Sequence, residues 1–377
     1  MGPTLELTCE LIERASLTPD DAGCQRLLAD RLEPFGFNAE WFQFGDVTNV
    51  VFTHGQAEPS LWFLGHTDVV PPGPLEDWTS PPFKAEVRNN ILYGRGAADM
   101  KGGVAAMVTA AEAFVSEYPE HAGQIGILLT SDEEGDAVDG VVKVAEVLKQ
   151  RGSAPQYCLV GEPSSREQLG DTVRIGRRGS IHARLQVFGV QGHSAFPEAL
   201  ENPIHSLATF LEALTREAWD EGDENFPPTH CQVTNIHAGT GAENVTPGRA
   251  EAWINFRNSP ASPTGEIRSR FEALLAQSGI QRYELGWLVS GEPFRSKAGD
   301  LRIALVGAIQ NELGIEPELN TGGGTSDGRF IAPLGTEVLE FGLLNASIHK
   351  VDENTATDDL EALSRVYQRI MVSLLTS

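Results

Sequence analysis

Short apolar runs of buried-strand character alternate with helical stretches through the first half of the chain. The apolar runs predict strands at 49–52, 61–64, 124–130 and 157–160. Apolar residues spaced three and four apart predict helices within 4–35, around a turn at 16–21, and then at 103–118 and 138–151. Because strands and helices alternate, we predict an α/β fold whose central, mostly parallel sheet is flanked by helices.

The pattern changes near Gly179, where 180–188 alternates apolar and polar side chains as a half-buried strand does. Further strands are predicted at 231–238, 249–256 and 282–289, with helices at 202–216 and 265–277. From Pro293 the α/β texture returns, with helices at 300–313 and 356–375 and a strand at 338–342. We therefore predict an α+β domain at 179–292, inserted into an α/β domain formed by 1–178 and 293–377.

Composition narrows the range of partners. Among 377 residues, 28 are basic and 53 acidic, which gives a formal net charge of -25. Such an acidic surface repels phosphates, so we expect neither nucleic acid nor an anionic membrane as a partner. No apolar run approaches the ~20 residues of a membrane span, and 1–13 lacks the pattern of a secretion signal. The four cysteines include no CxxC pair, which fits a cytoplasmic protein.

Histidines and carboxylates follow the predicted strands of the larger domain. They are His66, Asp132-Glu133-Glu134, Glu162 and His349, with Asp99 just before the helix at 103–118. Because ligands bind at the carboxyl ends of strands in open α/β sheets, we expect these side chains at one edge. Adjacent carboxylates repel one another unless a cation lies among them. Imidazole and carboxylate ligands suit zinc, or manganese and cobalt in its place.

Each candidate also has an ordinary structural interpretation. A lone histidine such as His66 or His349 is more often a hydrogen-bonded structural residue than a ligand. Asp99 fits a helix cap, Glu162 fits a turn, and the Glu133–Glu134 pair fits a solvated loop. The coincidence of all of them at one predicted edge favours a metal site with a spare carboxylate beside it.

Several longer motifs carry a resemblance to a known family. They are GHTDVVPPG (65–73), LYGRGAADMKGG (92–103), TSDEEGDAVDG (130–140), LVGEPSS (159–165) and GGGTSDGRFIA (322–332). Together they resemble the M20 family of zinc-dependent aminoacyl hydrolases, over about 16–354. The resemblance implies a zinc-exopeptidase-like catalytic domain and an inserted dimerisation domain. GRRGS (176–180), QGHSAFP (191–197), ENP (201–203) and GGTSDGRF (323–330) indicate the desuccinylase branch of the family.

The resemblance implies two Zn²⁺ ions, for which Co²⁺ or Mn²⁺ can substitute. In this family pattern His66 and Glu162 bind one ion, and Glu134 and His349 bind the other. Asp99 bridges both ions, and the peptide bond that follows it is cis.

Two further groups are implied to act beside the ions and two across a subunit interface. Glu133 binds no ion and is the general base, while Asp68 holds the His66 imidazole. His193 reaches the site of the partner subunit and stabilises the oxyanion, and Asn244 is supplied in the same way. The resemblance therefore implies a homodimer.

The implied reaction converts N-succinyl-LL-2,6-diaminopimelate into succinate and LL-2,6-diaminopimelate, for lysine and peptidoglycan precursors. This N-succinyl amino acid would contact Arg178, Ser180, Asn244, Arg257, Gly324, Thr325 and Asn345. Phe196 departs from the tyrosine usual at its position, so a hydroxyl contact would be missing. Another M20 deacylase, such as an acetylornithine deacetylase or an aminoacylase, stays open as an alternative. A non-catalytic relative is a further alternative, although neither a ligand nor the base is missing.

Overall fold

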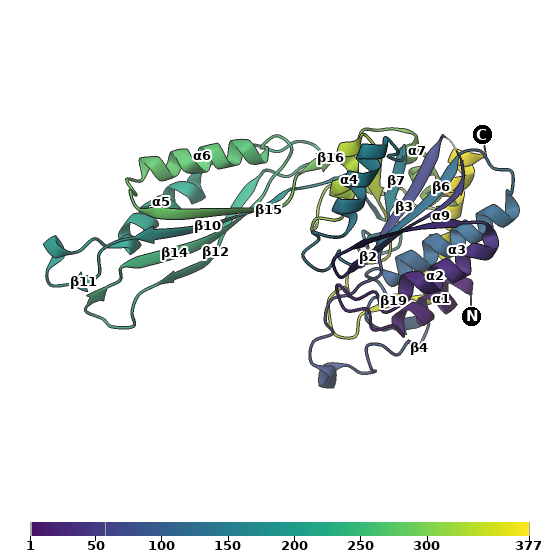
Figure 1. The fold of residues 1–377 in the computed structure, drawn as a ribbon, viewed down its shortest axis with the longest axis horizontal. Helices are drawn as coiled ribbons and strands as arrows, with labels where there is room; N and C mark the ends of the chain where they lie inside the picture. Colours follow the sequence, from purple (N-terminus) through teal and green to yellow (C-terminus); the bar gives the residue numbers. More distant parts are fainter. Residues whose placement is uncertain (1, 57, 377) are drawn as a thin grey trace. The chain divides into compact units, whose positions relative to one another are not determined.

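The computed structural model describes residues 2–56 and 58–376, which belong to two compact units (Figure 1). One unit lies within Met1–Gly176, Ser296–Asn320 and Ser326–Ser377, and the other comprises Arg177–Arg295 and Thr321–Thr325. Along the sequence, the chain passes between them at the short strands β9 (Gly176–Arg177) and β16 (Phe294–Arg295). Compared with the predicted insertion at 179–292, the second unit is longer at both ends and includes the glycine-rich segment 321–325.

An eight-stranded mixed sheet forms the centre of the first unit, in the order β1-β2-β6-β3-β7-β18-β8-β17. The strands are β1 (Asn38–Phe44), β2 (Val47–Gly55), β3 (Ser60–His66), β6 (Gln124–Thr130), β7 (Tyr157–Val160), β8 (Thr172–Arg174), β17 (Glu318–Asn320) and β18 (Glu337–Glu340). Strand β3 runs parallel to β6 and β7, and β18 runs parallel to β7. The predicted α/β class with a mostly parallel centre is confirmed.

Helices cover both faces of this sheet. Figure 1 shows α1 (Pro3–Ile12), α2 (Cys24–Leu32), α3 (Lys101–Glu117) and α9 (Thr357–Leu375) on one side and α4 (Val141–Arg151) on the other. Two further α-helices of the unit are α7 (Asp300–Leu313), which packs on α9, and the short α8 (Gly328–Ile331). Helix α3 is buried along nearly its whole length because it is rich in alanine and packs on α1, α9 and the sheet.

A three-stranded sheet lies apart from the main one, in the order β19-β5-β4. It comprises β4 (Glu86–Arg88), β5 (Ile91–Tyr93) and β19 (Asn354–Ala356), and the short helix η2 (Leu75–Asp77) lies in the loop before it. None of these strands was predicted, because each is three residues long and mixed in polarity. Their importance is positional: β5 leads directly into the Gly94–Asp99 turn, and β19 follows the turn that carries His349.

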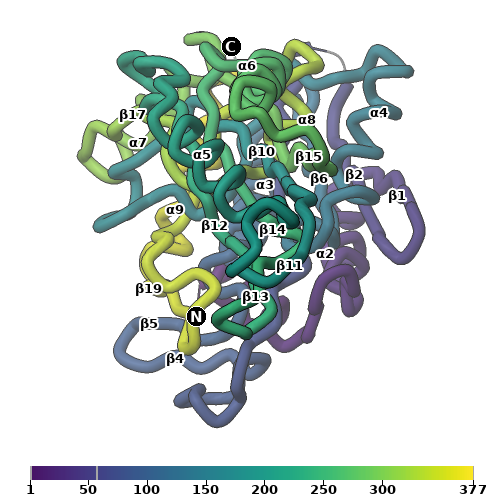
Figure 2. The backbone as a smooth tube through the Cα atoms, turned by 90° about the vertical axis from the view of Figure 1, so that its left-hand side faces the viewer, coloured from purple at the N-terminus to yellow at the C-terminus, as the bar shows by residue number. Residues whose placement is uncertain are grey.

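The second unit is an antiparallel four-stranded sheet with two helices. The sheet order is β12 (His230–Ala238), β14 (Arg249–Arg257), β10 (Ser180–Phe188) and β15 (Tyr283–Gly291). Helices α5 (Pro203–Arg216) and α6 (Thr264–Gln277) contribute Phe210 and Phe271 to a core of their own. The short strands β11 (Gly192–His193) and β13 (Val245–Thr246) pair with each other, and Figure 2 shows them side by side. The predicted antiparallel α+β texture is confirmed.

The cysteine thiols and the apolar character of the helices complete the description of the fold. All four cysteines lie in the described part of the chain, and each is a free thiol. Within 2–56 and 58–376, no helix combines the length and the apolar character needed to cross a membrane.

Candidate metal centre

The carboxyl ends of three neighbouring parallel strands meet at one edge of the main sheet. Strand β3 ends at His66, β6 leads into Asp132-Glu133-Glu134, and β7 leads through Gly161 into Glu162. Gly103 allows the N-terminal turn of α3 to approach the end of β7, because a Cβ on Gly103 would lie 2.7 Å from the Gly161 carbonyl oxygen. The sheet therefore brings the predicted ligands together by its topology, and α3 closes over them.

The imidazole of His66 is buried and held in one orientation. Its Nδ1 donates a hydrogen bond of 2.8 Å to the main-chain carbonyl oxygen of Asp68. Since a carbonyl oxygen only accepts, Nδ1 carries a proton and Nε2 is the atom available to a ligand. This Nε2 lies 3.2 Å from Asp99 Oδ1 and 3.7 Å from Glu162 Oε1.

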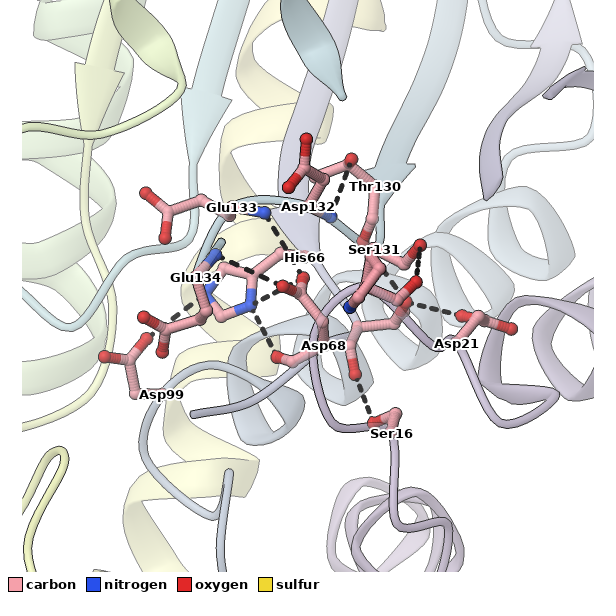
Figure 3. Close-up of polar contacts among 12 residues, drawn as sticks. Ser16, Asp21, His66, Asp68, Asp99, Thr130, Ser131, Asp132, Glu133 and Glu134 are labelled. Atoms are coloured by element: carbon pink, nitrogen blue, oxygen red, sulfur yellow. Dashed lines mark hydrogen bonds and ion pairs between the residues drawn. The ribbon is translucent and has the colours of Figure 1, made fainter. Parts of the chain in front are cut away.

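Asp99 lies between two histidines (Figure 3 shows it beside His66 and Glu134). Its Oδ1 is 3.2 Å from His66 Nε2, and its Oδ2 is 3.2 Å from His349 Nε2. His349 Nε2 also lies 2.9 Å from Glu134 Oε1. One carboxylate with one oxygen turned to each imidazole is the arrangement of a bridging ligand. The Asp99–Met100 peptide is cis, as the family resemblance implies.

The carboxylate of Asp68 contacts the turn after β6. Its Oδ1 is 3.6 Å from His66 Nδ1, a longer separation than the hydrogen bond made by its own main-chain carbonyl. The main-chain N–H groups of Glu133 and Glu134 donate to the two Asp68 carboxylate oxygens over 3.4 and 3.2 Å. Asp68 therefore positions His66 through its main chain and the turn through its side chain.

The three consecutive carboxylates after β6 leave the turn in different directions (Figure 3). Asp132 Oδ2 accepts hydrogen bonds from the main-chain N–H groups of Val138 and Asp139 at 3.0 and 3.1 Å, so this side chain shapes the loop. Glu134 points to His349 and Asp99, as described above. The carboxylate of Glu133 lies on the other side, where it can meet His66 and Glu162.

Charges in the cluster shift its proton affinities. Hydrogen bonds to Asp99 and Glu134 raise the pKa of His349 to about 10. Burial, and then the charge of Glu162, raises the pKa of Glu133 well above its usual value. Burial alone would raise the pKa of Asp99, yet its hydrogen bonds with His349 and His66 lower it instead. In the absence of a cation, protonated histidines and a protonated carboxyl thus relieve the repulsion.

The donor set fits divalent ions. Two groups offer one ligand atom from each member within 4.8 Å of one another: His66, Glu133 and Glu162, and His66, Asp99 and Glu134. Nearby, the buried Asp327 has two carboxylate oxygens without a hydrogen-bond partner among the described residues, and burial raises its pKa to about 6. Carboxylates this crowded are stable together when a cation lies among them. The geometry admits Glu133 as a ligand as well as a base.

The other predicted site residues fall into separate groups. In the second unit, Asn244 Nδ2 lies 3.4 Å from His193 Nε2, and the Ala195 N–H donates to His193 Nδ1 over 3.1 Å. Burial, and then the charge of Arg257, lowers the pKa of Arg178. The remaining predicted contacts are Ser180 at the start of β10, Gly324 and Thr325 in the second unit, and Asn345 in the first unit.

Two buried carboxylates near the cluster, Asp327 and Glu353, were not predicted from the sequence. Asp327 belongs to the GGTSDGRF motif, but nothing in the motif alone indicates burial beside the cluster. Glu353 accepts hydrogen bonds from the main-chain N–H groups of Ala98 and Asp99 at 3.0 and 2.9 Å. In the sequence, the position of Glu353 four residues after the candidate ligand His349 was the signal that could have indicated this role.

Similarity to solved structures agrees with this fold. An M20 family metallo-carboxypeptidase from Sulfolobus solfataricus superposes with a TM-score of 0.80 at 18% identity, covering 99% of both chains. A dinuclear metal binding peptidase of the M20 family from Bacillus subtilis gives a TM-score of 0.71 at 16% identity, covering 98% of this chain and 96% of the other. At such identities the likeness shows the fold alone.

The fold and the ligand cluster define a metal-dependent hydrolase. The chain belongs to peptidase family M20/M25/M40, which it matches over residues 62–373. Among its relatives, the succinyl-diaminopimelate desuccinylase of Methylococcus capsulatus is 56% identical over 375 residues, covering 100% of this chain and 99% of the relative. The desuccinylases of Stenotrophomonas maltophilia and Nitrosococcus oceani are 54% and 53% identical, with full coverage of both chains.

Proposed function

We propose that this chain hydrolyses N-succinyl-LL-2,6-diaminopimelate to succinate and LL-2,6-diaminopimelate. Full-length identity of 53–56% to desuccinylases supports the substrate. The observation that carries the chemistry is the position of the Asp99 carboxylate. Its Oδ1 lies 3.2 Å from His66 Nε2, and its Oδ2 lies 3.2 Å from His349 Nε2. We propose zinc as the metal because imidazole and carboxylate donors suit it, with Co²⁺ or Mn²⁺ as substitutes. Such a biosynthetic step, in a chain with free thiols, suits a reducing cytoplasm.

In this proposal His66 and Glu162 would hold one ion, Glu134 and His349 would hold the other, and Asp99 would be shared between them. Ions bound there would polarise the amide carbonyl and lower the pKa of the attacking water. Glu133 accepts the proton of that water and delivers it to the departing amine nitrogen. Burial, and then the charge of Glu162, raises the pKa of Glu133, and a more basic carboxylate is a better acceptor for the proton of the attacking water.

The anionic substrate needs a basic site on an otherwise acidic protein. Arg178 and Arg257, both in the second unit, are the proposed basic groups. The buried Nε atom of Arg178 has no hydrogen-bond partner among the described residues, and burial, then the charge of Arg257, lowers the pKa of Arg178. A succinyl carboxylate between them would satisfy both. Ser180 accepts a 3.5 Å hydrogen bond from Asn255 and lies on the same sheet. Gly324, Thr325 and Asn345 complete the proposed set of contacts.

Replacing Arg178 by leucine should reduce kcat/KM for N-succinyl-LL-diaminopimelate by about 10²-fold, because a charge-assisted hydrogen bond is worth up to ~3 kcal/mol. The effect on N-acetyl-LL-diaminopimelate, which lacks the extra carboxylate, should be much smaller. Arg216→Leu, at an exposed arginine of α5, serves as the control. Steady-state kinetics on both substrates give the comparison. An equal loss on the two substrates would remove Arg178 from succinyl recognition, and a preference of the native protein for acetylornithine would favour the rival deacylase activity.

We propose further that the active form is a homodimer in which His193 and Asn244 serve the site of the partner. The Ala195 N–H donates to His193 Nδ1 over 3.1 Å, and Asn244 Nδ2 lies 3.4 Å from His193 Nε2, so the two proposed residues lie together. An imidazole N–H is the type of donor that stabilises an oxyanion. The exposed edge strand β12, with Ile236 58% exposed, offers a surface for a second copy.

Mixing two inactive variants tests this arrangement. If His193 acts in trans, His193→Ala and Glu133→Ala subunits refolded together at equal amounts should recover about a quarter of native activity, since half of the dimers are mixed and each has one complete site. Each variant refolded alone is the control. Activity of the mixture no greater than the sum of the separate variants would contradict action across the interface.

A further inference from the structure

Glu353 is a charged side chain with no exposure to solvent at all. Its carboxylate accepts four hydrogen bonds. Oε1 accepts from the main-chain N–H groups of Ala98 and Asp99 at 3.0 and 2.9 Å, and Oε2 accepts from the N–H of Gly96 at 3.0 Å and from Arg95 at 2.7 Å. Every one of these donors lies in the 94–99 turn, which ends at the proposed bridging ligand. A single carboxylate therefore fixes the main chain on which Asp99 stands.

Arg95, the charged partner of Glu353 in this contact, is also buried. It is 2% exposed, and its guanidinium lies over the Trp78 ring at 5.3 Å. The main chain of Glu353 adds a further bond, since its carbonyl oxygen accepts from the Gly94 N–H at 3.0 Å. If Arg95 or Glu353 were removed, the charge of the other would stay buried without a partner. The pair therefore stabilises the conformation of the 94–99 turn.

The same short stretch of chain carries His349. His349 has a φ of 60° and Asp352 a φ of 56°, so the turn between them uses left-handed conformations that non-glycine residues rarely adopt. Asp352 anchors the turn by accepting hydrogen bonds from the Thr79 N–H and hydroxyl at 2.8 and 2.5 Å. Glu353, four residues after His349, then joins this turn to the Asp99 turn.

We propose that Glu353 is a positioning residue that sets the separation of Asp99 and His349 and thereby the affinity for the metal they share. The inference rests on the proposed function, because it takes Asp99 and His349 as ligands of one ion. Groups that orient metal ligands typically change metal affinity by about 10- to 100-fold when they are replaced. Glu353 acts here on two ligands at once, through the main chain of one and the loop of the other.

The test is metal binding by Glu353→Gln, measured without substrate. Glutamine keeps the size of the side chain but places an N–H₂ group against donors that need acceptors. We expect the dissociation constant for Co²⁺ or Zn²⁺, measured by competition with a chromophoric chelator, to rise about 10- to 100-fold for one ion of the pair. The visible spectrum of the Co²⁺ form should change as well. Excess metal should restore part of the lost turnover.

Glu361→Gln is the matched control. Glu361 accepts from the main-chain N–H groups of Thr4 and Leu5 at 3.1 and 3.0 Å, so its replacement removes the same kind of hydrogen bond outside the metal centre. It should lower the melting temperature without changing metal affinity. Arg95→Lys provides a second variant if Glu353→Gln does not fold, with a smaller weakening of metal binding expected.

The inference is overturned if a folded Glu353→Gln, or Arg95→Lys in its place, binds both ions as tightly as the native protein, whatever its melting temperature. Failure of the proposed function looks different: the native protein itself would then bind no pair of ions in the same titration.

Discussion

Glu133→Gln is expected to lower kcat for N-succinyl-LL-diaminopimelate by about 10²- to 10⁴-fold while the metal content stays native. Glutamine matches the size of Glu133 but cannot take a proton from the attacking water or deliver it to the amine. The effect should fall on kcat rather than KM, because Glu133 acts on the reacting atoms and not on the remote parts of the substrate. Steady-state kinetics together with elemental analysis of the purified variant provide the measurement.

Glu134→Gln is the informative comparison, since the substituted residue is the next one along the chain. Glu134 Oε1 lies 2.9 Å from His349 Nε2, so replacing the Glu134 carboxylate should abolish the binding of one ion as well as the activity. A native turnover number for Glu133→Gln would contradict its role as the base. Loss of an ion from Glu133→Gln would instead make Glu133 a ligand, which the 4.8 Å cluster with His66 and Glu162 permits.

Removing the metal should abolish turnover and lower the melting temperature by roughly 10 °C. Ions present at a thousand times their dissociation constants stabilise the folded state by about 4 kcal/mol, and a protein of this size loses a few degrees per kcal/mol. Chelation followed by calorimetry, with readdition of Zn²⁺ as the control, gives the result. Equal melting temperatures with and without chelator would show that the cluster does not need a cation.

The metal-free form should also become less stable as the pH rises. The pKa of His349 is raised from 6.5 to about 10, so its contribution is complete below 6.5 and is lost as the pH rises toward 10. The pKa of Glu133 is raised above 4.5, so the cost of its burial also grows above that pH. Bound ions take the place of these protons. Melting curves from pH 5 to 9 should therefore slope more steeply without metal than with it, and parallel curves would contradict this.

Sequence alone predicted the ligand-bearing edge because parallel strands end on the same side of a sheet. The runs at 124–130 and 157–160 match β6 and β7 in both bounds, and the run at 61–64 lies within β3 (Ser60–His66), so His66, Glu134 and Glu162 were placed by topology rather than by contacts. Edge strand β1 was missed because most of its side chains are exposed, which leaves no apolar run to detect.

The supporting contacts could not be predicted in the same way. Glu353 and the main-chain N–H groups that it binds are more than 250 residues apart, and no periodicity connects them. The orientation of His66 rests on a main-chain carbonyl, which sequence does not distinguish from any other. Sequence placed the ligands, whereas their geometry depends on long-range contacts that only the folded chain defines.

A zinc titration of the metal-free protein tests the central claim most directly, with bound metal and cleavage of N-succinyl-LL-diaminopimelate followed in the same samples. The account predicts that about two ions bind per chain, since the five proposed ligands form a bridged pair, and that turnover rises with their occupancy. Full turnover by the metal-free protein, or saturation of activity with no bound ion, would contradict it.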